Sequence, residues 1–231
     1  MTLAIELLLA DRSLKVKYTL TSYRALSDAR SELSELENFI GKSTFLLSSW
    51  KVRWIGICSV LRAGFYVIQK DAQSCIHSKL KRELASSWET IKSDKESYEL
   101  FWKFLKHQRD LILKQYQWQA YEVWLNSETG KTRRQFSLLD VRSEEEKMVL
   151  VMSSGPFSGM DSMHLLSKCA NLLESTIFSA IEAAGFDPDE EVFVRDFAKV
   201  SEFPERQKTA RLRQARANEL FAARNGRSKK S

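Results

Sequence analysis

Residues 47–73, LSSWKVRWIGICSVLRAGFYVIQKDAQ, carry the strongest indication of the fold. Taken as a helix at about 100° per residue, this segment has two neighbouring apolar stripes. One stripe holds Trp54, Ile57, Leu61, Phe65 and Ile68, and the other holds Ile55, Cys58 and Tyr66. A helix that is apolar on most of its sides is buried within its protein. The segment therefore predicts a central helix with other helices packed around it.

Length and composition agree with a mostly helical protein. The chain has 231 residues, of which 43% are hydrophobic, and a chain of this size can bury a large core. Pro156 is the first proline, so the whole preceding part lacks the residue that most strongly interrupts helices. Residues 22–39 repeat apolar side chains at helical spacing among charges. That pattern is typical of an amphipathic surface helix.

Two serine–glutamate pairs predict where later helices begin. Ser86 with Glu89, and Ser93 with Glu96, fit the capping box, in which the two side chains satisfy each other's exposed backbone N–H groups. The second pair is expected to open a long helix over about 94–125. Four helices in this first half of the chain predict an antiparallel bundle.

The pattern changes after this predicted bundle. The stretches QFSLLDV (135–141) and KMVLVMSS (147–154) are short, rich in apolar or β-forming residues, and separated by polar residues. They favour a β-hairpin, whereas Ser143 with Glu146 offers a helix cap as the alternative. The sequence leaves both structures open for this segment.

The rest of the chain is again expected to be helical. Asp161 is a predicted N-cap for a helix that ends at Gly185, and 189–200 is predicted as a short helix. The predicted fold is thus mainly α, an antiparallel bundle with a small β-hairpin insertion. We expect 1–125 to form the bundle and 126–200 to complete the same domain.

Residues 201–231 are predicted as a basic helical tail. From Pro204 onward there are nine lysines and arginines against two glutamates, while the whole chain has a formal charge of +6. The remainder is therefore close to neutral. The tail either contacts nucleic acid by neutralising phosphates, or it is a solvated helix that aids solubility or packs on an acidic face such as SEEEK (143–147). The cations proposed for the nucleic-acid contact are Arg206, Lys208, Arg211, Arg213 and Arg216.

Several classes of protein are disfavoured by the sequence. Cys58, Cys75 and Cys169 are widely spaced in apolar patterns and are expected to be buried free thiols. The N-terminal LAIELLLA is shorter than the roughly 20 apolar residues of a membrane span and lacks a preceding basic region, so a cytoplasmic protein is expected. The sequence contains no common nucleotide-loop, nucleophile or metal motif, and we predict neither a metal site nor a cofactor.

The stretch FWKFLKHQRDLILKQYQW (101–118) places an arginine where apolar residues are expected. At helical spacing, Arg109 lies within about 60° of Trp102, Leu105, Ile112 and Tyr116. Arg62 is similarly placed on the predicted central helix. A buried guanidinium needs carboxylate or carbonyl partners or access to water. The two arginines are therefore either packing clamps, paired with Asp71, Asp94 or Asp110, or parts of a polar pocket that both share.

A family resemblance accompanies these arginines. LRAGFYVIQKD (61–71) followed by RDLILKQY (109–116) resembles the paired-helix pattern of HEPN-like helical-bundle proteins. In catalytic members of that superfamily, an arginine, a polar residue and a later histidine form a metal-independent ribonuclease site, often at a dimer interface. Arg109 and Asp110 match the opening, and Lys114 stands where a histidine is expected. The resemblance implies Arg109, Asp110 and Lys114 as the catalytic group, and a homodimer.

The predicted function is binding of RNA, another nucleic acid or a nucleotide, with the ribonuclease activity that the resemblance implies. Arg62 would contribute to a phosphate site, and Tyr66 or Tyr116 would hydrogen-bond to the ligand or stack on a base. His107 lies on a separate polar stripe, which is more typical of a solvated face than of a proton-transfer group. The alternative is a non-catalytic interaction protein with structural arginines and a tail that docks a partner.

Overall fold

The computed structural model describes residues 13–41, 49–133 and 146–197, and their fold is mainly α with small antiparallel sheets, as predicted. The helices are α2 (Val16–Thr19), α3 (Thr21–Gly41), α4 (Ser49–Ser74), α5 (Ser78–Ser93), the π-helix η1 (Leu100–Leu105), α6 (Lys106–Gln115), α7 (Ser162–Ala183) and the 3-10 helix η2 (Val194–Asp196). The strands are β1 (Ser13–Lys15), β2 (Ala120–Asn126), β3 (Thr132–Arg133), β4 (Glu146–Met152) and β5 (Glu191–Phe193).

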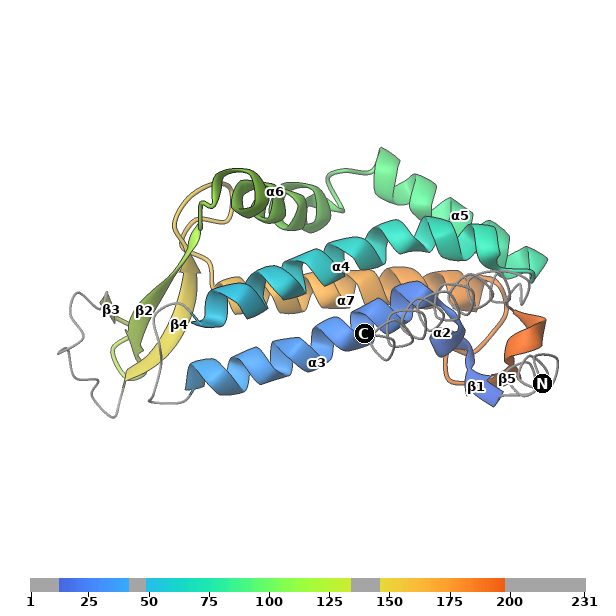
Figure 1. Ribbon diagram of the computed structural model, residues 1–231, viewed down its shortest axis with the longest axis horizontal. Coiled ribbons are helices and arrows are strands. Elements are labelled where there is room, and N and C mark those ends of the chain that lie inside the picture. Colours follow the sequence, from blue (N-terminus) through green and yellow to red (C-terminus); the bar gives the residue numbers. More distant parts are fainter. Residues whose placement is uncertain (1–12, 42–48, 134–145, 198–231) are drawn as a thin grey trace, which may run out of the picture.

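Helix α4 is central, as its apolar stripes predict. It contacts α3, α5, α6, α7 and η1, and α3 and α7 also contact each other. Figure 1 shows α3, α4 and α7 along the long axis, with α3 running opposite to α4 and α6 lying over the N-terminal half of α4. The sheet β3-β2-β4 lies at one end of the helices and the β1–β5 pair lies at the other.

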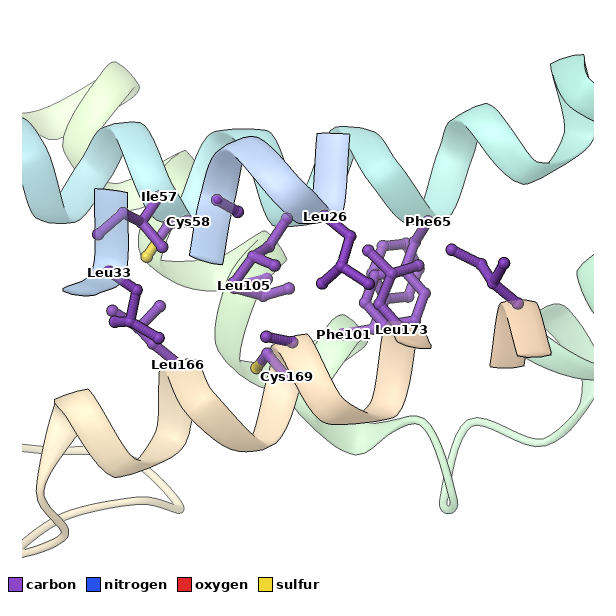
Figure 2. Packing of buried hydrophobic residues seen from close by; sticks show 14 of the residues in the cluster. Leu26, Leu33, Ile57, Cys58, Phe65, Phe101, Leu105, Leu166, Cys169 and Leu173 are labelled. Atoms are coloured by element: carbon purple, nitrogen blue, oxygen red, sulfur yellow. The ribbon is translucent and has the colours of Figure 1, made fainter. Parts of the chain in front are cut away.

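The core is formed where α3, α4, η1 and α7 meet. Figure 2 shows Leu26 and Leu33 of α3, Ile57, Cys58 and Phe65 of α4, Phe101 and Leu105 of η1, and Leu166, Cys169 and Leu173 of α7. The helices approach closely at Gly64, where an added Cβ would lie 2.6 Å from Leu173 Cδ2. A larger residue at this position would force the fully buried side chain of Leu173 to shift.

The start of α3 is held by a buried carboxylate from α4. Asp71 is 4% exposed and accepts hydrogen bonds from the backbone N–H groups of Thr21 at 3.0 Å and Ser22 at 2.8 Å. The first N–H groups of a helix have no partner within it, so a carboxylate there satisfies them and also favours the positive end of the helix dipole. Asp71 therefore caps a neighbouring helix and does not pair with an arginine.

The predicted capping boxes are wrong. Helix α5 continues through Ser86 and Glu89, because its buried residues Leu80, Leu84, Trp88 and Ile91 keep helical spacing across them. Ser93 is the last residue of α5, and the side chain of Asp94 accepts from Ser97 N at 3.0 Å. Asp94 therefore caps the turn that leads into η1.

The long helix predicted over 94–125 is interrupted twice. It contains the π-helix η1, and α6 ends before Tyr116, which adopts the left-handed conformation. The run AYEVWLN then forms β2, which pairs antiparallel with β4 from Ala120↔Met152 to Asn126↔Glu146. Its β-branched and aromatic residues suit a strand. The KMVLVMSS strand is thus confirmed, but its partner is β2. QFSLLDV lies outside the described residues.

The C-terminal predictions have mixed outcomes. Asp161 caps α7 by accepting from Met163 N at 2.8 Å, and Gly185 follows the helix with φ +90, both as predicted. The short helix predicted over 189–200 is wrong for 191–196, which form the strand β5 and the 3-10 helix η2, and 198–200 lie outside the described residues. Pairing of β5 with β1 accounts for the difference, since it draws the segment into an extended form. The basic tail lies outside the described residues.

Ion pairs of two lysines with one aspartate join the segment before α3 to the segment after α7. Lys15 Nζ and Lys17 Nζ lie 2.9 Å and 2.8 Å from Asp189 Oδ1, and Val16 N donates to Glu190 O at 2.9 Å. Hydrogen bonds from Lys17 and Lys15 hold the pKa of Asp189 below its ordinary value, and the bond to Asp189 raises the pKa of Lys17 despite its burial.

We expect an Asp189→Asn variant to be less stable than the wild type near neutral pH. An aspartate with a lowered folded-state pKa contributes stability above its unfolded pKa and loses that contribution as pH falls through the folded value. The difference in free energy of unfolding between the two proteins should therefore vanish in strong acid. Urea denaturation of both proteins from neutral to acidic pH measures it, and a difference independent of pH would contradict this assignment.

Candidate anion-binding site

Arg109 flanks the buried face of α6 and does not lie at its centre. The buried side chains of η1 and α6 are Phe101, Phe104, Leu105, Gln108 and Ile112. Gln108, 2% exposed, occupies the middle of this face, whereas the side chain of Arg109 is 35% exposed. The predicted central position was wrong because Tyr116, counted as part of the apolar stripe, lies beyond the end of α6 and is exposed, while Gln108 takes a place on the buried face.

Arg109 and Lys114 both contact Asp110. Arg109 Nη1 donates to Asp110 Oδ1 at 3.0 Å, and Lys114 Nζ lies 3.6 Å from Asp110 Oδ2. All three residues belong to α6, and the lysine, 71% exposed, reaches solvent. The structure therefore brings together the three residues for which the family resemblance implied catalysis.

Arg62 of α4 joins the same group. Its charge, like those of Lys114 and Arg109, acts on the Asp110 carboxyl. Burial alone would raise the pKa of Asp110, but the hydrogen bond from Arg109 and the three cations outweigh burial and hold that pKa below its ordinary value. We call Arg62, Arg109, Lys114 and Asp110 the arginine cluster. Arg109 and Lys114 pair with Asp110 directly, whereas Arg62 forms no ion pair within 4.0 Å among the described residues and acts on Asp110 only through its charge.

Arg62 has hydrogen-bonding capacity that the protein does not use. Its Nε is buried and has no hydrogen-bond partner among the residues that the structure describes. The guanidinium lies over the ring of Tyr66, with 5.0 Å between its carbon and the ring centroid. A cation–π contact of this kind orients the guanidinium plane but satisfies none of its N–H donors. Arg62 is thus a partly buried cation with an unmet donor.

Further lysines lie over aromatic rings in the region beside the cluster. Tyr66 contacts Trp88 and Phe101 at centroid distances of 5.4 and 5.3 Å, and Phe101 contacts Trp102 at 4.7 Å. Lysines lie over the two tryptophan rings: Lys92 over Trp88 at 6.0 Å, and Lys95 and Lys106 over Trp102 at 5.6 and 5.4 Å. Trp88 and Phe101 are buried, so these rings belong to the core and the lysines cover its edge.

Tyr116, the third predicted ligand-binding residue, lies at the end of α6. Its side chain is 80% exposed, and its backbone has φ 52 and ψ 33. The ring meets Trp118 edge-on at 6.1 Å. Tyr116 thus shares the helix of Arg109 and Lys114, whereas Tyr66 lies beside Arg62 on α4.

A hydrogen-bonded group of polar side chains, which the sequence did not indicate, joins α6 to the residue before β2. Gln108 Nε2 donates to Gln119 Oε1 at 2.6 Å, and Gln119 Nε2 lies 3.4 Å from His107 Nε2. Gln108 Oε1 is buried without a hydrogen-bond partner among the described residues. His107 itself is exposed, as expected. The only indication in the sequence was a glutamine within an apolar helical pattern, and the pattern did not show which residue the glutamine would contact.

The aromatic side chains of 94–125 are largely used within the chain. Phe101 and Phe104 are buried, Trp102 Nε1 donates to Ile91 O at 2.9 Å, and Tyr98 and Thr176 hydroxyls lie 3.3 Å apart. Within 94–125, Tyr116 is the only aromatic residue that is exposed. Homodimer formation stays a prediction.

Other site types find little support in the part of the chain that the structure describes. No group of three or more His, Cys, Asp or Glu side chains there is arranged to hold a metal ion. No described helix is long and apolar enough to cross a membrane. Cys58, Cys75 and Cys169 are buried and free, as predicted, and burial raises the pKa of each thiol, which disfavours the reactive thiolate.

Comparison with known proteins gives no relative for this chain. No protein family, no curated protein and no solved structure matches it. The function is therefore argued from the geometry and charge of the arginine cluster.

Proposed function

We propose that the chain binds a phosphate-bearing ligand, a nucleic acid or a nucleotide, at the arginine cluster. The observation that carries this proposal is the pairing of Arg109 and Lys114 with the single carboxylate of Asp110, at 3.0 and 3.6 Å, with the charge of Arg62 on α4 acting on the same carboxylate. Three cations around one carboxylate leave an excess of positive charge.

The chemistry of the arginine side chain suits the binding of phosphate. Its planar guanidinium presents several N–H donors in a fixed arrangement that matches phosphate oxygens. Tyr66, below the Arg62 guanidinium, fixes the plane of that group before the ligand arrives. Such an arrangement lowers the entropy lost on binding.

The alternative of a structural clamp is weaker for Arg109. A clamp joins two elements, whereas Arg109 pairs with Asp110, the next residue of its own helix. That contact holds no second helix in place. Arg62 forms no ion pair within 4.0 Å among the described residues, so it too lacks the contact that defines a clamp.

Ribonuclease activity, implied by the HEPN-like resemblance, is an extension of this proposal. Cleavage by the 2′-hydroxyl requires a proton acceptor and a cation that stabilises the phosphorane. The cluster supplies the cations, and Asp110, kept ionised by its lowered pKa, is the nearest acceptor. Its low basicity makes it a weak base at neutral pH. We therefore propose binding as the primary function, and the basic tail as a source of sequence-independent affinity.

Replacing either arginine with methionine should weaken binding of a short labelled RNA by about ten- to a hundredfold. This range corresponds to the loss of about 1.5–3 kcal/mol for a hydrogen bond to a charged group. Methionine keeps much of the apolar stem, so we expect the free energy of unfolding to change by less than about 2 kcal/mol. Fluorescence anisotropy of Arg62→Met and Arg109→Met, with ATP as competitor, measures the effect, and the same samples report RNA cleavage.

Two further variants make the test specific. Arg53→Met is the matched control, because Arg53 lies on α4 but pairs with Glu32 at 2.8 Å. Asp110→Asn removes the carboxylate that competes with the ligand and should strengthen binding. If the arginine variants and Arg53→Met lose the same affinity, binding arises from general charge and the cluster is not the site.

A further inference from the structure

Tyr116 occupies a backbone conformation that a bulky residue rarely adopts. It follows the last residue of α6 with φ 52, and its N–H donates to Ile112 O at 3.0 Å. Helices often end on such a left-handed residue, but glycine is the usual occupant because it lacks a Cβ. Tyrosine at this position is disfavoured by the backbone, and its ring, 80% exposed, contributes little to the core.

The ring of Tyr116 is supported from below by a packed aromatic group. It stands edge-on against Trp118, whose centroid lies 6.1 Å from Trp50 and 6.3 Å from Trp54. Trp50 and Trp54 are fully buried, and Lys51 lies over the Trp118 ring at 5.6 Å. Tyr116 therefore presents an aromatic surface to solvent on a support that is anchored in α4.

This exposed ring lies on the same helix as the arginine cluster. Seven residues separate Arg109 from Tyr116, which is about 10 Å along a helix. The C-terminal end of a helix is its negative end, and Lys114 in the last turn of α6 offsets that charge. Tyr116 itself is uncharged, so its exposed ring offers stacking to a neutral, flat group, while the cations of the cluster offer charge to a phosphate.

We infer that Tyr116 is a stacking platform for an unpaired base of a single-stranded nucleic acid. The inference rests on the proposed function, since the phosphates of the same strand would lie at the arginine cluster. Bases stack on exposed aromatic side chains with little regard to sequence, because every base has a π-face. In a duplex both faces of an internal base are covered by its neighbours, so a paired strand would not reach the ring.

The test compares a short labelled single-stranded RNA with an abasic strand of the same length and with the corresponding duplex. Tyr116→Gly should weaken binding of the single-stranded RNA about tenfold, the effect expected for loss of one base stack. It should leave the affinity for the abasic strand unchanged. Tyr116→Phe, which keeps the ring, should bind like the wild type. Phe193→Ala, which removes an aromatic side chain 44% exposed on β5, is the matched surface control.

The outcomes separate this inference from the proposed function. If Tyr116→Gly binds both strands as the wild type does, while Arg109→Met loses both, the arginine cluster stands and the stacking platform is overturned. If wild-type protein binds neither strand, the proposed function fails as well. Equal affinity of the wild type for single strand and duplex would also overturn the platform. Thermal denaturation of Tyr116→Gly should show no loss of stability, since glycine suits the left-handed position.

Discussion

Replacing Phe65 with alanine is expected to lower the free energy of unfolding by about 4 kcal/mol, the loss typical of a fully buried phenylalanine. Phe65 is 0% exposed and its ring lies 4.8 Å from that of Phe101 and 6.4 Å from that of Tyr98. Figure 2 shows it among the side chains that join α4 to η1 and α7. The cavity could not close easily, because helices on several sides are held by their own contacts.

Urea denaturation followed by circular dichroism measures this effect. The larger part of the loss should come from contacts with η1, so the binding site on α6 should also become less ordered. Phe193→Ala is again the control, and its free energy of unfolding should change by less than about 0.5–1 kcal/mol because Phe193 is 44% exposed. A loss of similar size in both variants would show that Phe65 is not part of a packed core.

Replacing Asp71 with alanine should cost about 3 kcal/mol of stability. The carboxylate satisfies two backbone N–H groups, of Thr21 and Ser22, and Ser22 is fully buried. An unsatisfied buried donor costs about 1–3 kcal/mol, and this variant leaves two donors without a partner. Loss of the negative charge at the start of α3 adds to the effect.

The Asp71→Asn variant tests whether the hydrogen-bond acceptor of Asp71 accounts for the loss of stability in Asp71→Ala. Asparagine keeps one acceptor oxygen of the same reach, so it should lose clearly less stability than alanine does. Hydrogen exchange at the amide of Ser22 should accelerate in the alanine variant, because its hydrogen-bond acceptor is gone. Equal losses in the two variants, with unchanged exchange at Ser22, would contradict the capping role.

The long helices could be predicted because their sequence patterns and their tertiary contacts agree. Helix α4 is apolar on adjacent stripes and is central, and α7 begins at the predicted Asp161 and ends before the predicted Gly185. The errors occur where tertiary pairing decides. AYEVWLN becomes a strand because β4 is available as its partner, and the segment of β5 is extended because it pairs with β1.

The composition of the site was more predictable than its geometry. A charged residue within an apolar pattern indicated Arg62, Arg109 and, among the candidate carboxylates, Asp110, which pairs with Arg109. The same reasoning did not indicate the buried Gln108, because burying a neutral amide costs less free energy than burying a charge and so is less conspicuous in a sequence. The exposure of Tyr116 was also unpredictable, since it follows from the end of α6 at Gln115.

The π-helix η1 holds one residue more than an α-helix needs for the same turn. The segment before α6 therefore carries an extra residue without turning α6 about its axis. Deleting one residue from Leu100–Leu105 would allow an ordinary α-helix and would leave Arg109 and Asp110 on the face of the helix that they now occupy. A deletion within α6, between Asp110 and Lys114, would instead rotate Lys114 by about 100° relative to Asp110. The site thus tolerates a change of chain length before α6 better than one within it.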